Sequence, residues 1–469
     1  MLESLSLRFG EESLRPPIPA IRRSAGAQRP PPPEATPGYV PRWLAALAIS
    51  DAITYGKPLD DRFHGPDGET PSQVLDPRDR ALARSIAVVA MRRLGTIRKT
   101  LGRYLEKGMP RKSGPLEPTL IAACAQLLFL DTSDHAAVDL AIRAVRADPA
   151  SSPYAALANA VLRNIARAKL EIVGDAEPMD DTPLWLAARW RAHYGEETTL
   201  KLAAAHLTEP TLDLTVKSDA EGWAEKLGGR VLPTGSVRLD THTAIPDLQG
   251  YADGEWWVQD AAAALPARLL PVSPGDRVVD LCAAPGGKTA QLALRGARVF
   301  ALDRSAQRLK RVAANLERLK LEAELVVGNA ATYDGGPFDA VLVDAPCSAT
   351  GTIRRHPDVA WTKRSSDLPG LAKTQADLLT RAVALVKKGG TVVYSTCSLE
   401  PEEGEAQIAA LLRRHPEVAR VPICAQEIGG LSECVTPLGD LRTLPCQLPA
   451  DTPRQSGLDG FFAARLVRN

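Results

Sequence analysis

The stretch Asp280-Leu-Cys-Ala-Ala-Pro-Gly-Gly-Lys-Thr289 decides the fold of the C-terminal half of this 469-residue chain. It overlaps residues 277–282, a short, largely apolar and β-branched run that predicts a buried parallel strand. Gly286 and Gly287 then precede a helix-like run that starts at Lys288. A strand, a glycine turn and a helix N-terminus form the first unit of a nucleotide-binding fold, in which backbone N–H groups approach a ligand closely. An ordinary tight turn between strand and helix is the alternative.

The spacing of the glycines narrows the choice of ligand. The loop lacks the G-x-G-x-x-G pattern of dinucleotide sites and the G-x-x-x-x-G-K-[ST] pattern of a phosphate-binding P-loop. A nucleoside-type ligand remains, and S-adenosylmethionine is the leading candidate.

Strands and helices alternate after this unit, which predicts a doubly wound, Rossmann-like parallel sheet. Ser305 is expected to cap one of the helices. The expected strands are residues 277–282, 298–303, 323–327, 338–344 and 391–395, with residues 461–467 as a late edge strand.

Polar residues follow four of these strands at their carboxyl ends, where ligands lie in an open α/β sheet. Asp303 lies where a carboxylate meets ribose hydroxyls, although it could instead cap the next helix. Asn329 could face an adenine edge. Asp344-Ala-Pro-Cys347 and Thr396-Cys397 end the two remaining strands.

Cys347 and Cys397 are the most distinctive pair. Either cysteine alone is best explained as a small buried hydrophobe. Together, opposite a methyl-donor loop, they suggest a reaction that needs a thiol nucleophile, such as methylation of carbon 5 of a pyrimidine. A thiolate adds at carbon 6, and the resulting enamine attacks the methyl donor. The base must be single-stranded or flipped out of its helix. These residues alone do not tell which thiol is the nucleophile.

The rest of the chain predicts further domains. Residues 1–38 are rich in proline and predict a disordered arm. Residues 39–175 show helical periodicity and predict a bundle of five helices, including one over residues 81–105. Residues 176–250 predict a small α+β connector, and residues 251–469 the nucleotide-binding domain.

The net charge of +1 hides a local asymmetry. Residues 76–112 contain eleven basic and three acidic residues, which suggests a phosphate backbone as partner. A solvated helix face is the alternative. The candidate RNA contacts in this segment are Arg92, Arg93, Arg98 and Lys99.

The seven cysteines include no C-x-x-C pair, and the histidines form no cluster at metal-ligand spacing. A disulfide framework or a metal site is therefore not expected. No apolar run approaches membrane-spanning length, and the first residues lack the apolar core of a signal peptide. We expect a cytoplasmic, metal-free monomer with no membrane contact.

The chain resembles RNA cytosine-5 methyltransferases, specifically the bacterial RsmB/Sun group that acts on 16S ribosomal RNA. The helical region resembles a NusB-like RNA-binding domain in its helix count, basic face and position. The motifs that carry the main resemblance are DLCAAPGGKTA (280–290), ALDRS (301–305), DAPCSATGTIRRHPD (344–358), YSTCS (394–398) followed by PEE (401–403), and DGFF (459–462).

The resemblance implies a role for each motif. Cys397 would be the nucleophile, and Cys347 would assist release by promoting proton removal from carbon 5. Asp344 and Lys288 would also be catalytic. The residues that would hold S-adenosylmethionine or shape its pocket are Cys282, Ala283, Ala284, Pro285, Gly286, Gly287, Lys288, Asp303, Asn329 and Asp344.

Three expectations stay open at this point. The family usually has Asp at the position of Asn329, so weaker cofactor binding is expected. Arg354 and Arg355 could contact substrate phosphates or belong to an exposed polar loop. The substrate could be tRNA in place of 16S rRNA, and a non-catalytic RNA-binding or antitermination factor is the rival from another class.

Overall fold

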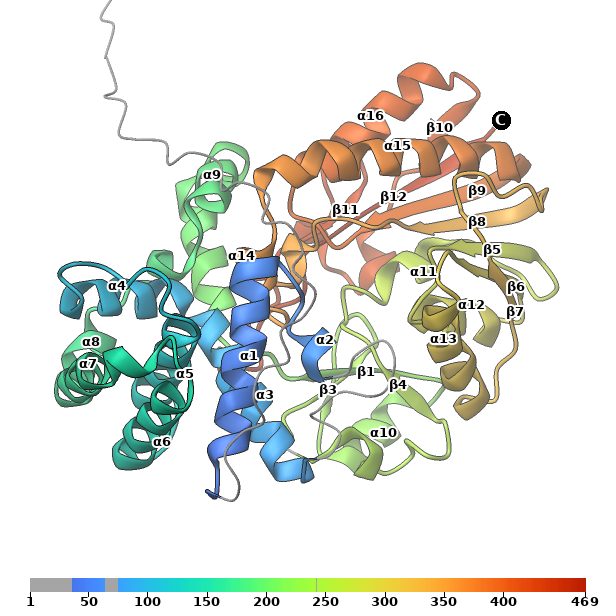
Figure 1. Cartoon of the computed structure of the whole chain (residues 1–469). Coiled ribbons are helices and arrows are strands. Elements are labelled where there is room, and N and C mark those ends of the chain that lie inside the picture. The colour runs from blue at the N-terminus through green and yellow to red at the C-terminus, as the bar shows by residue number, and fades with distance from the viewer. Residues whose placement is uncertain (1–35, 64–74, 242) are drawn as a thin grey trace, which may run out of the picture.

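The computed structural model describes residues 36–63, 75–241 and 243–469. The proline-rich arm predicted for residues 1–38 lies outside these ranges except for residues 36–38. Three regions follow one another along the chain: a helical bundle, a small α+β unit, and a large sheet with helices on both faces (Figure 1). The predicted fold class is therefore confirmed.

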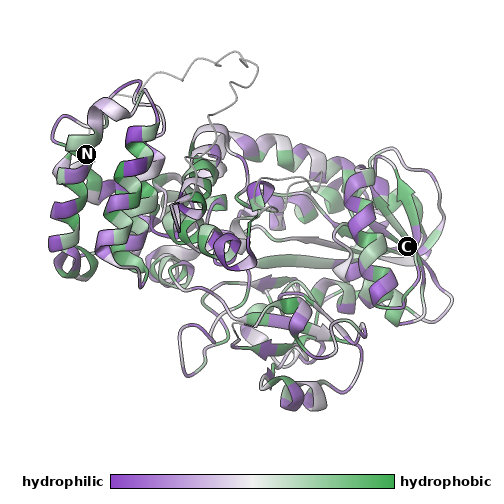
Figure 2. Cartoon of the chain, turned by 60° about the horizontal axis from the view of Figure 1, so that its bottom comes forward, coloured by the Kyte–Doolittle hydropathy of each residue, from purple (hydrophilic) through white to green (hydrophobic). Residues whose placement is uncertain are grey.

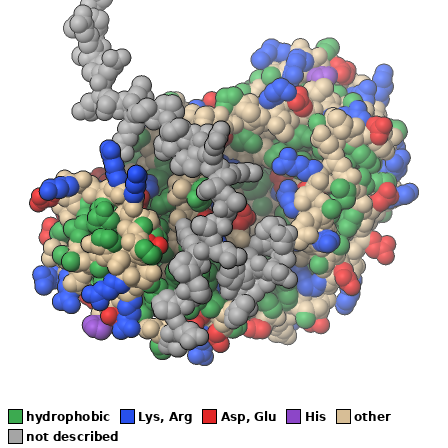
Figure 3. Space-filling view, viewed as in Figure 1, with side chains coloured by type: hydrophobic (Ala, Val, Ile, Leu, Met, Phe, Trp, Pro, Cys, Tyr) green, Lys and Arg blue, Asp and Glu red, His purple; other side chains and the backbone are tan. Residues whose placement is uncertain are grey.

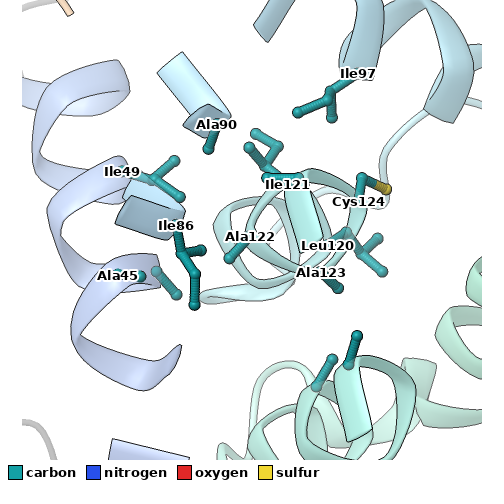
Figure 4. Close-up of a cluster of buried hydrophobic side chains, with 14 of the residues drawn as sticks. Ala45, Ile49, Ile86, Ala90, Ile97, Leu120, Ile121, Ala122, Ala123 and Cys124 are labelled. Atoms are coloured by element: carbon teal, nitrogen blue, oxygen red, sulfur yellow. The ribbon is translucent and has the colours of Figure 1, made fainter. Parts of the chain in front are cut away.

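The helical bundle is organised around α5, whose side chains are almost all buried. Helices α1, α3, α6 and α7 surround it, so the helix has to be apolar on every side. Figure 4 shows side chains of α5 facing Ile49, Ile86 and Ile97. The bundle consists of α1 (Tyr39–Tyr55), α2 (Asp60–Phe63), α3 (Pro77–Arg92), α4 (Leu94–Tyr104), α5 (Leu116–Phe129), α6 (Asp134–Ala147), α7 (Ala155–Arg167) and α8 (Lys169–Gly174).

The outer helices of the bundle have mixed polarity, with hydrophobic and hydrophilic bands along the same ribbon (Figure 2). Such helices bury one face and expose the other.

The single helix predicted over residues 81–105 is wrong, because the chain breaks between α3 and α4 at Arg93. The start of α4 is held by Asp181, which accepts hydrogen bonds from the Thr96 backbone N–H and hydroxyl, both at 2.8 Å. A side chain on Gly95 would overlap the backbone of Asp180. The break therefore depends on a segment far along the chain, which helical periodicity cannot detect.

The small α+β unit follows α9 (Leu184–His206), a helix kinked at Gly195. Its antiparallel sheet has the order β2-β3-β1-β4. The predicted boundary at residue 250 would divide this sheet, because β4 pairs with β1. The elements are β1 (Leu212–Val216), α10 (Ala220–Leu227), β2 (Arg230–Val231), β3 (Val237–Leu239) and β4 (Trp256–Val258).

The large sheet has the order β10-β12-β9-β8-β5-β6-β7, with β11 paired to β12. Strands β5 to β9 are parallel, and β12 is antiparallel to β9. The strands are β5 (Arg277–Leu281), β6 (Arg298–Asp303), β7 (Glu324–Val327), β8 (Phe338–Asp344), β9 (Val386–Thr396), β10 (Val418–Arg420), β11 (Leu441–Thr443) and β12 (Phe461–Arg468).

Helices cover both faces of this sheet (Figure 1). Helices α15 and α16 lie over one face, and α12 and α13 over the other. The helices of this region are α11 (Leu265–Leu269), α12 (Gly287–Leu294), α13 (Ala306–Arg318), α14 (Val359–Thr362), α15 (Leu368–Leu385) and α16 (Glu405–Arg414). In the described ranges, no helix combines the length and the apolar character needed to cross a membrane.

Two strand predictions need correction. Residues 461–467 do not form an edge strand, because β12 lies between β9 and β10. Phe462, Ala464 and Leu466 are fully buried, as an interior strand requires. Strand β9 starts at Val386, five residues before the predicted start.

Candidate active site

A cavity of about 560 Å³ lies at the carboxyl ends of β5 and β8, where the large sheet meets the small α+β unit. This is the position predicted for a ligand in an open α/β sheet. The large sheet and its loops contribute Asp280, Ala283, Pro285, Gly286, Gly287, Lys288, Asp344, Cys397, Asp459 and Phe461. Helix α13 contributes Asn315 and Arg318, and the small α+β unit and the segment after it contribute Tyr251, Trp257, Gln259 and Asp260.

The glycine loop between β5 and α12 forms one wall of this cleft. Gly286 caps α12 with φ of 102°, and a Cβ there would lie 3.1 Å from the Val312 side chain. Only glycine meets both conditions without strain. Asn315 on α13 fixes this loop, because its amide donates to the Pro285 carbonyl at 3.1 Å. The first N–H groups of α12 are therefore presented at a fixed place beside the cleft.

Asp280 is a buried carboxyl at the end of β5. Thr289 donates a hydrogen bond to its Oδ2 at 2.6 Å, and burial raises the pKa of Asp280 to about 7. Its Oδ1 is buried and has no hydrogen-bond donor among the described residues. Cys282 follows with φ of 70°, and burial raises the pKa of its thiol to about 12. Asp280 thus offers a free acceptor to a ligand, whereas Cys282 stays a neutral thiol.

Asp303 ends the neighbouring strand β6. Its Oδ1 accepts from the Ser305 backbone N–H at 2.9 Å, and Ser305 is the helix cap, as predicted. Its Oδ2 lies 3.2 Å from Arg308 Nη1 but has no hydrogen-bond donor within the described ranges. Arg308 also donates to the Ala284 carbonyl at 2.8 Å. Arg308 therefore joins Asp303 to the glycine loop, a role that its position in the first turn of α13 could have suggested.

Asn329 lies on an exposed loop after β7. Its side-chain oxygen accepts from the Ala331 backbone N–H at 3.1 Å. Neither Asn329 nor Asp303 is among the described residues that line the 560 Å³ cavity. Their predicted contacts with a nucleoside remain predictions.

Lys288 and Asp344 form an ion pair between α12 and the end of β8. Lys288 Nζ lies 2.7 Å from Asp344 Oδ2, and Ser395 donates to the other carboxylate oxygen at 3.0 Å. The Lys288 ammonium also lies 5.1 Å from the centre of the Phe461 ring. This arrangement fixes a positive and a negative group side by side at the wall of the cleft.

Cys347 and Cys397 are brought together because β8 and β9 are parallel neighbours, with Asp344 beside Ser395. Their sulfur atoms lie 3.4 Å apart. Cys397 lines the cleft, whereas Cys347 is not among the described residues that line it. The hydrogen bond with Cys397, together with burial, raises the pKa of Cys347.

The predicted phosphate contact of Arg354 is wrong, because its side chain is buried. The Arg355 side chain is 20% exposed and lines the cleft, so its predicted phosphate contact stays a prediction. Arg354 is buried, and its Nη1 donates to the Ser456 carbonyl at 2.6 Å. Arg355 is hydrogen-bonded to Asp260 and lies 3.2 Å from Asp459, with Asp213 at 3.6 Å. These carboxylates hold the loop that follows Cys347 onto the small unit.

The four predicted RNA contacts in the basic segment of the bundle also differ in exposure. Arg92 is buried and donates to the backbone carbonyls of His206 and Arg354, so its predicted RNA contact is wrong. Arg93 lies over the Phe129 ring, 5.0 Å from its centre, and 3.7 Å from Asp181. The side chains of Arg98 and Lys99 are 44% and 50% exposed and pair with Glu117 and Asp180, so their predicted RNA contacts stay predictions. Figure 3 shows Lys and Arg side chains on the rim of the bundle, where such contacts are possible.

Several cleft residues were not predicted. Asp260 and Asp459 are buried carboxylates, and Arg355 forms an ion pair with each of them. Trp257 donates to Gln259 at 2.9 Å, and both line the cleft. The run Trp256-Trp-Val-Gln-Asp260 precedes β5 in the sequence, and it is the signal that could have located these cleft residues.

The chain is similar to two families along most of its length. Residues 267–467 match the family model described as 16S rRNA methyltransferase RsmB/F, and residues 41–167 match the NusB family. Ribosomal RNA small subunit methyltransferase B of Xylella fastidiosa (strain Temecula1) is 34% identical, over 92% of this chain and 99% of the relative. The protein of the same name from Xanthomonas campestris pv. campestris is 36% identical, over 84% of this chain and 92% of the relative.

Solved structures share the fold. The crystal structure of PH0851 aligns with a TM-score of 0.69 at 24% identity, over 92% of this chain and 99% of that one. A methyltransferase homolog protein from Pyrococcus horikoshii aligns with a TM-score of 0.50 at 25% identity, over 61% of this chain and 95% of that one.

Proposed function

The chain belongs to the RsmB/F family of 16S rRNA methyltransferases, and from this premise we propose that it methylates carbon 5 of a cytosine in 16S rRNA. The observation that carries the proposal is the pair of sulfur atoms 3.4 Å apart, with Cys397 in the wall of the cleft. Methyl transfer to a ring nitrogen or a ribose hydroxyl would need no such pair, because those atoms are nucleophiles already.

The cofactor is S-adenosylmethionine, which supplies an electrophilic methyl group. The cleft fits such a ligand, because a buried acceptor without a donor among the described residues lies in its wall, on Asp280 at the end of β5. Hydroxyl and amino groups of a nucleoside ligand are the donors that this oxygen lacks. Asp303 is assigned to the ribose hydroxyls. We assign the loop from Cys282 to Lys288 to the same ligand, because a backbone bend at Gly286 lets it approach closely. Asn329 is assigned to the adenine edge.

Cys397 is the proposed nucleophile. Its thiol loses a proton, and the sulfur adds to carbon 6 of cytosine, so that the carbon 5–carbon 6 double bond opens and carbon 5 gains an electron pair. That pair would take the methyl group from the sulfonium sulfur of S-adenosylmethionine, which would leave as S-adenosylhomocysteine. A base would then take the proton from carbon 5, and the electron pair of that C–H bond would restore the double bond and expel the Cys397 thiolate. The position of Cys397 in the cleft wall supports this assignment.

Cys347 is assigned to the release step, in which it promotes removal of the carbon 5 proton. The contact between the two sulfur atoms supports this assignment, because it places Cys347 next to the thiol that would hold the base.

Lys288 and Asp344 are assigned to the polar edge of the base. Addition of a thiolate at carbon 6 places negative charge on the pyrimidine ring. A fixed ammonium group beside that ring stabilises this charge without rearrangement. Asp344 holds the ammonium group in place at 2.7 Å.

The test is methyl transfer from labelled S-adenosylmethionine to RNA isolated from a strain that lacks the protein. We expect label in 16S rRNA, at a cytosine that bisulfite mapping identifies as 5-methylcytosine, and none in tRNA. The Cys397→Ala variant should leave both RNAs unlabelled. Label in tRNA alone, or label in 16S rRNA at a position that bisulfite still converts, would contradict the proposal.

A further inference from the structure

A buried carboxylate ties together the two loops that carry the thiols. Glu403 ends the short 3₁₀ turn η7 (Pro401–Glu403) and is fully buried. We propose that Glu403 is a positioning residue, which holds Cys347 and Cys397 at the separation that the reaction needs. This inference rests on the two-thiol reaction proposed above.

The Cys347 loop is held on both sides of the cysteine. The backbone N–H of Ser348 donates to Glu403 Oε1 at 2.9 Å. The amide of Gln375 donates to the same oxygen at 2.9 Å and to the Pro346 carbonyl at 3.0 Å. Both peptide neighbours of Cys347 are therefore fixed, one directly and one through Gln375.

The Cys397 loop meets the other carboxylate oxygen. The hydroxyl of Ser398 donates to Glu403 Oε2 at 2.6 Å, and the hydroxyl of Ser348 binds the same oxygen. The backbone carbonyl of Glu403 accepts from the Tyr394 hydroxyl at 2.8 Å, on the strand that leads to Cys397. One residue thus holds the chain before Cys397, after Cys397 and after Cys347.

The chemistry of these contacts requires a carboxylate. Its two oxygens accept from backbone, amide and hydroxyl donors at once, whereas an amide offers one acceptor and one donor. The nearby Glu400, Glu402 and Glu405 form ion pairs with arginines, but none of the salt bridges found among the described residues includes Glu403. A buried carboxylate without a cation is costly unless it is fully hydrogen-bonded. Among the described residues, this carboxylate accepts from Ser348, Ser398 and Gln375, which lie in or beside the thiol loops.

The expected consequence concerns the rate and not the binding of ligands. Glu403 is not among the described residues that line the cleft. Looser thiol loops would leave the cofactor and RNA surfaces intact but misplace the sulfur atoms. A misplacement of about 1 Å can lower a rate by about a hundredfold.

The experiment compares Glu403→Gln with the wild type and with Glu402→Gln. The control changes the same residue type one position earlier, on a side chain that is 46% exposed and paired with Arg189. Four quantities are measured on the full chain: kcat and KM for 16S rRNA, the affinity for S-adenosylmethionine, and the thermal midpoint. A fifth readout does not depend on methyl transfer. Diamide, which is reduced to its hydrazine, oxidises two adjacent thiols to a disulfide, and peptide mass mapping follows the Cys347–Cys397 link over time.

We expect Glu403→Gln to lower kcat by about tenfold to a hundredfold, with KM and cofactor affinity unchanged, and to slow the Cys347–Cys397 cross-link. Glu402→Gln should match the wild type in all readouts. A wild-type kcat and cross-linking rate in Glu403→Gln would overturn the inference, as would a loss of cofactor affinity equal to the loss of rate. If the wild type methylates no cytosine, the proposed function fails, while the cross-linking rate still decides whether Glu403 holds the thiols together.

Discussion

Arg92 and Arg354 meet inside the protein, where the guanidinium group of Arg92 donates a hydrogen bond to the Arg354 backbone carbonyl at 2.8 Å. The same group donates to the His206 carbonyl at 2.9 Å. Trp361 returns a hydrogen bond to the Met91 carbonyl at 2.8 Å. Helix α3 of the bundle is therefore fastened to the segment that follows Cys347. The helical region and the active-site loops are joined through a buried arginine.

Replacement of Arg92 by Met should lower the free energy of unfolding by about 1.5–3 kcal/mol, because buried carbonyls lose charge-assisted hydrogen bonds. Burial lowers the pKa of Arg92 to about 10, so the side chain is still charged at neutral pH. Urea unfolding followed by circular dichroism gives the value. The control is Arg143→Met, since Arg143 has a 52% exposed side chain on α6, where it pairs with Asp139 one turn away. Equal losses in both variants would mean that the buried hydrogen bonds of Arg92 contribute nothing.

The RNA surface of the bundle should depend on the two exposed basic residues, Arg98 and Lys99. Their joint replacement by Ala should weaken binding of 16S rRNA fragments. It should also reduce the slope of log affinity against log salt by about 0.7–0.9 for each phosphate that the variant no longer neutralises. Filter binding at several salt concentrations measures both effects. The matched variant replaces Arg143 and Lys201, which are also exposed and paired, and it should keep the wild-type slope. An unchanged slope in Arg98→Ala/Lys99→Ala would assign those charges to a solvated face.

The sequence predicted the parallel strands well because each is a short run of apolar, β-branched residues, as in β5 and β8. The thiol pair followed from this, since Cys347 and Cys397 come directly after neighbouring strands. The place of β12 could not be predicted in the same way. Strand composition indicates burial, but the order in a sheet depends on crossovers between distant segments.

The arginines show a second limit. Arg92, Arg98 and Lys99 look alike in a count of local charge, yet Arg92 is buried and the other two are about half exposed. The difference comes from carbonyl partners 114 and 262 positions away in the chain. Local charge patterns therefore found the basic segment but not the residues in it that face solvent.

Asp280 should make stability depend on pH. Its carboxyl ionises near 4 in an unfolded chain, whereas burial raises its pKa to about 7 in the folded protein. A raised folded pKa contributes stability that is fully present below about pH 4 and is lost as pH rises through 7. Asp280→Asn cannot ionise, so between about pH 5 and about pH 8 it should gain about 2–3 kcal/mol relative to the wild type. Urea unfolding at both pH values gives this relative change, even if the buried amide lowers stability overall. A difference between the two proteins that is the same at both pH values would show that Asp280 ionises normally.

The two thiols should fail differently, although their sulfur atoms are only 3.4 Å apart. Without Cys397 no bond to carbon 6 can form, so Cys397→Ala should be inactive while it still binds RNA and cofactor. In Cys347→Ala, the Cys397 sulfur should still add to carbon 6 and carbon 5 should still receive the methyl group. The reaction should then stall before elimination of the thiolate. The observable is a protein–RNA adduct that survives denaturing gel electrophoresis and carries the labelled methyl group.

Control reactions test which of the two thiols is the nucleophile. The adduct should require S-adenosylmethionine and should be absent from the double variant, because the trap needs the nucleophile. Cys424→Ala is a third cysteine variant, at an exposed thiol that is not among the described residues lining the cleft, so it should neither trap RNA nor abolish trapping in Cys347→Ala. If the adduct accumulates in Cys397→Ala and disappears in Cys347→Ala, the roles are reversed. The thiol outside the cleft wall would then be the nucleophile, and the Cys347 loop would have to move before the base could be attacked.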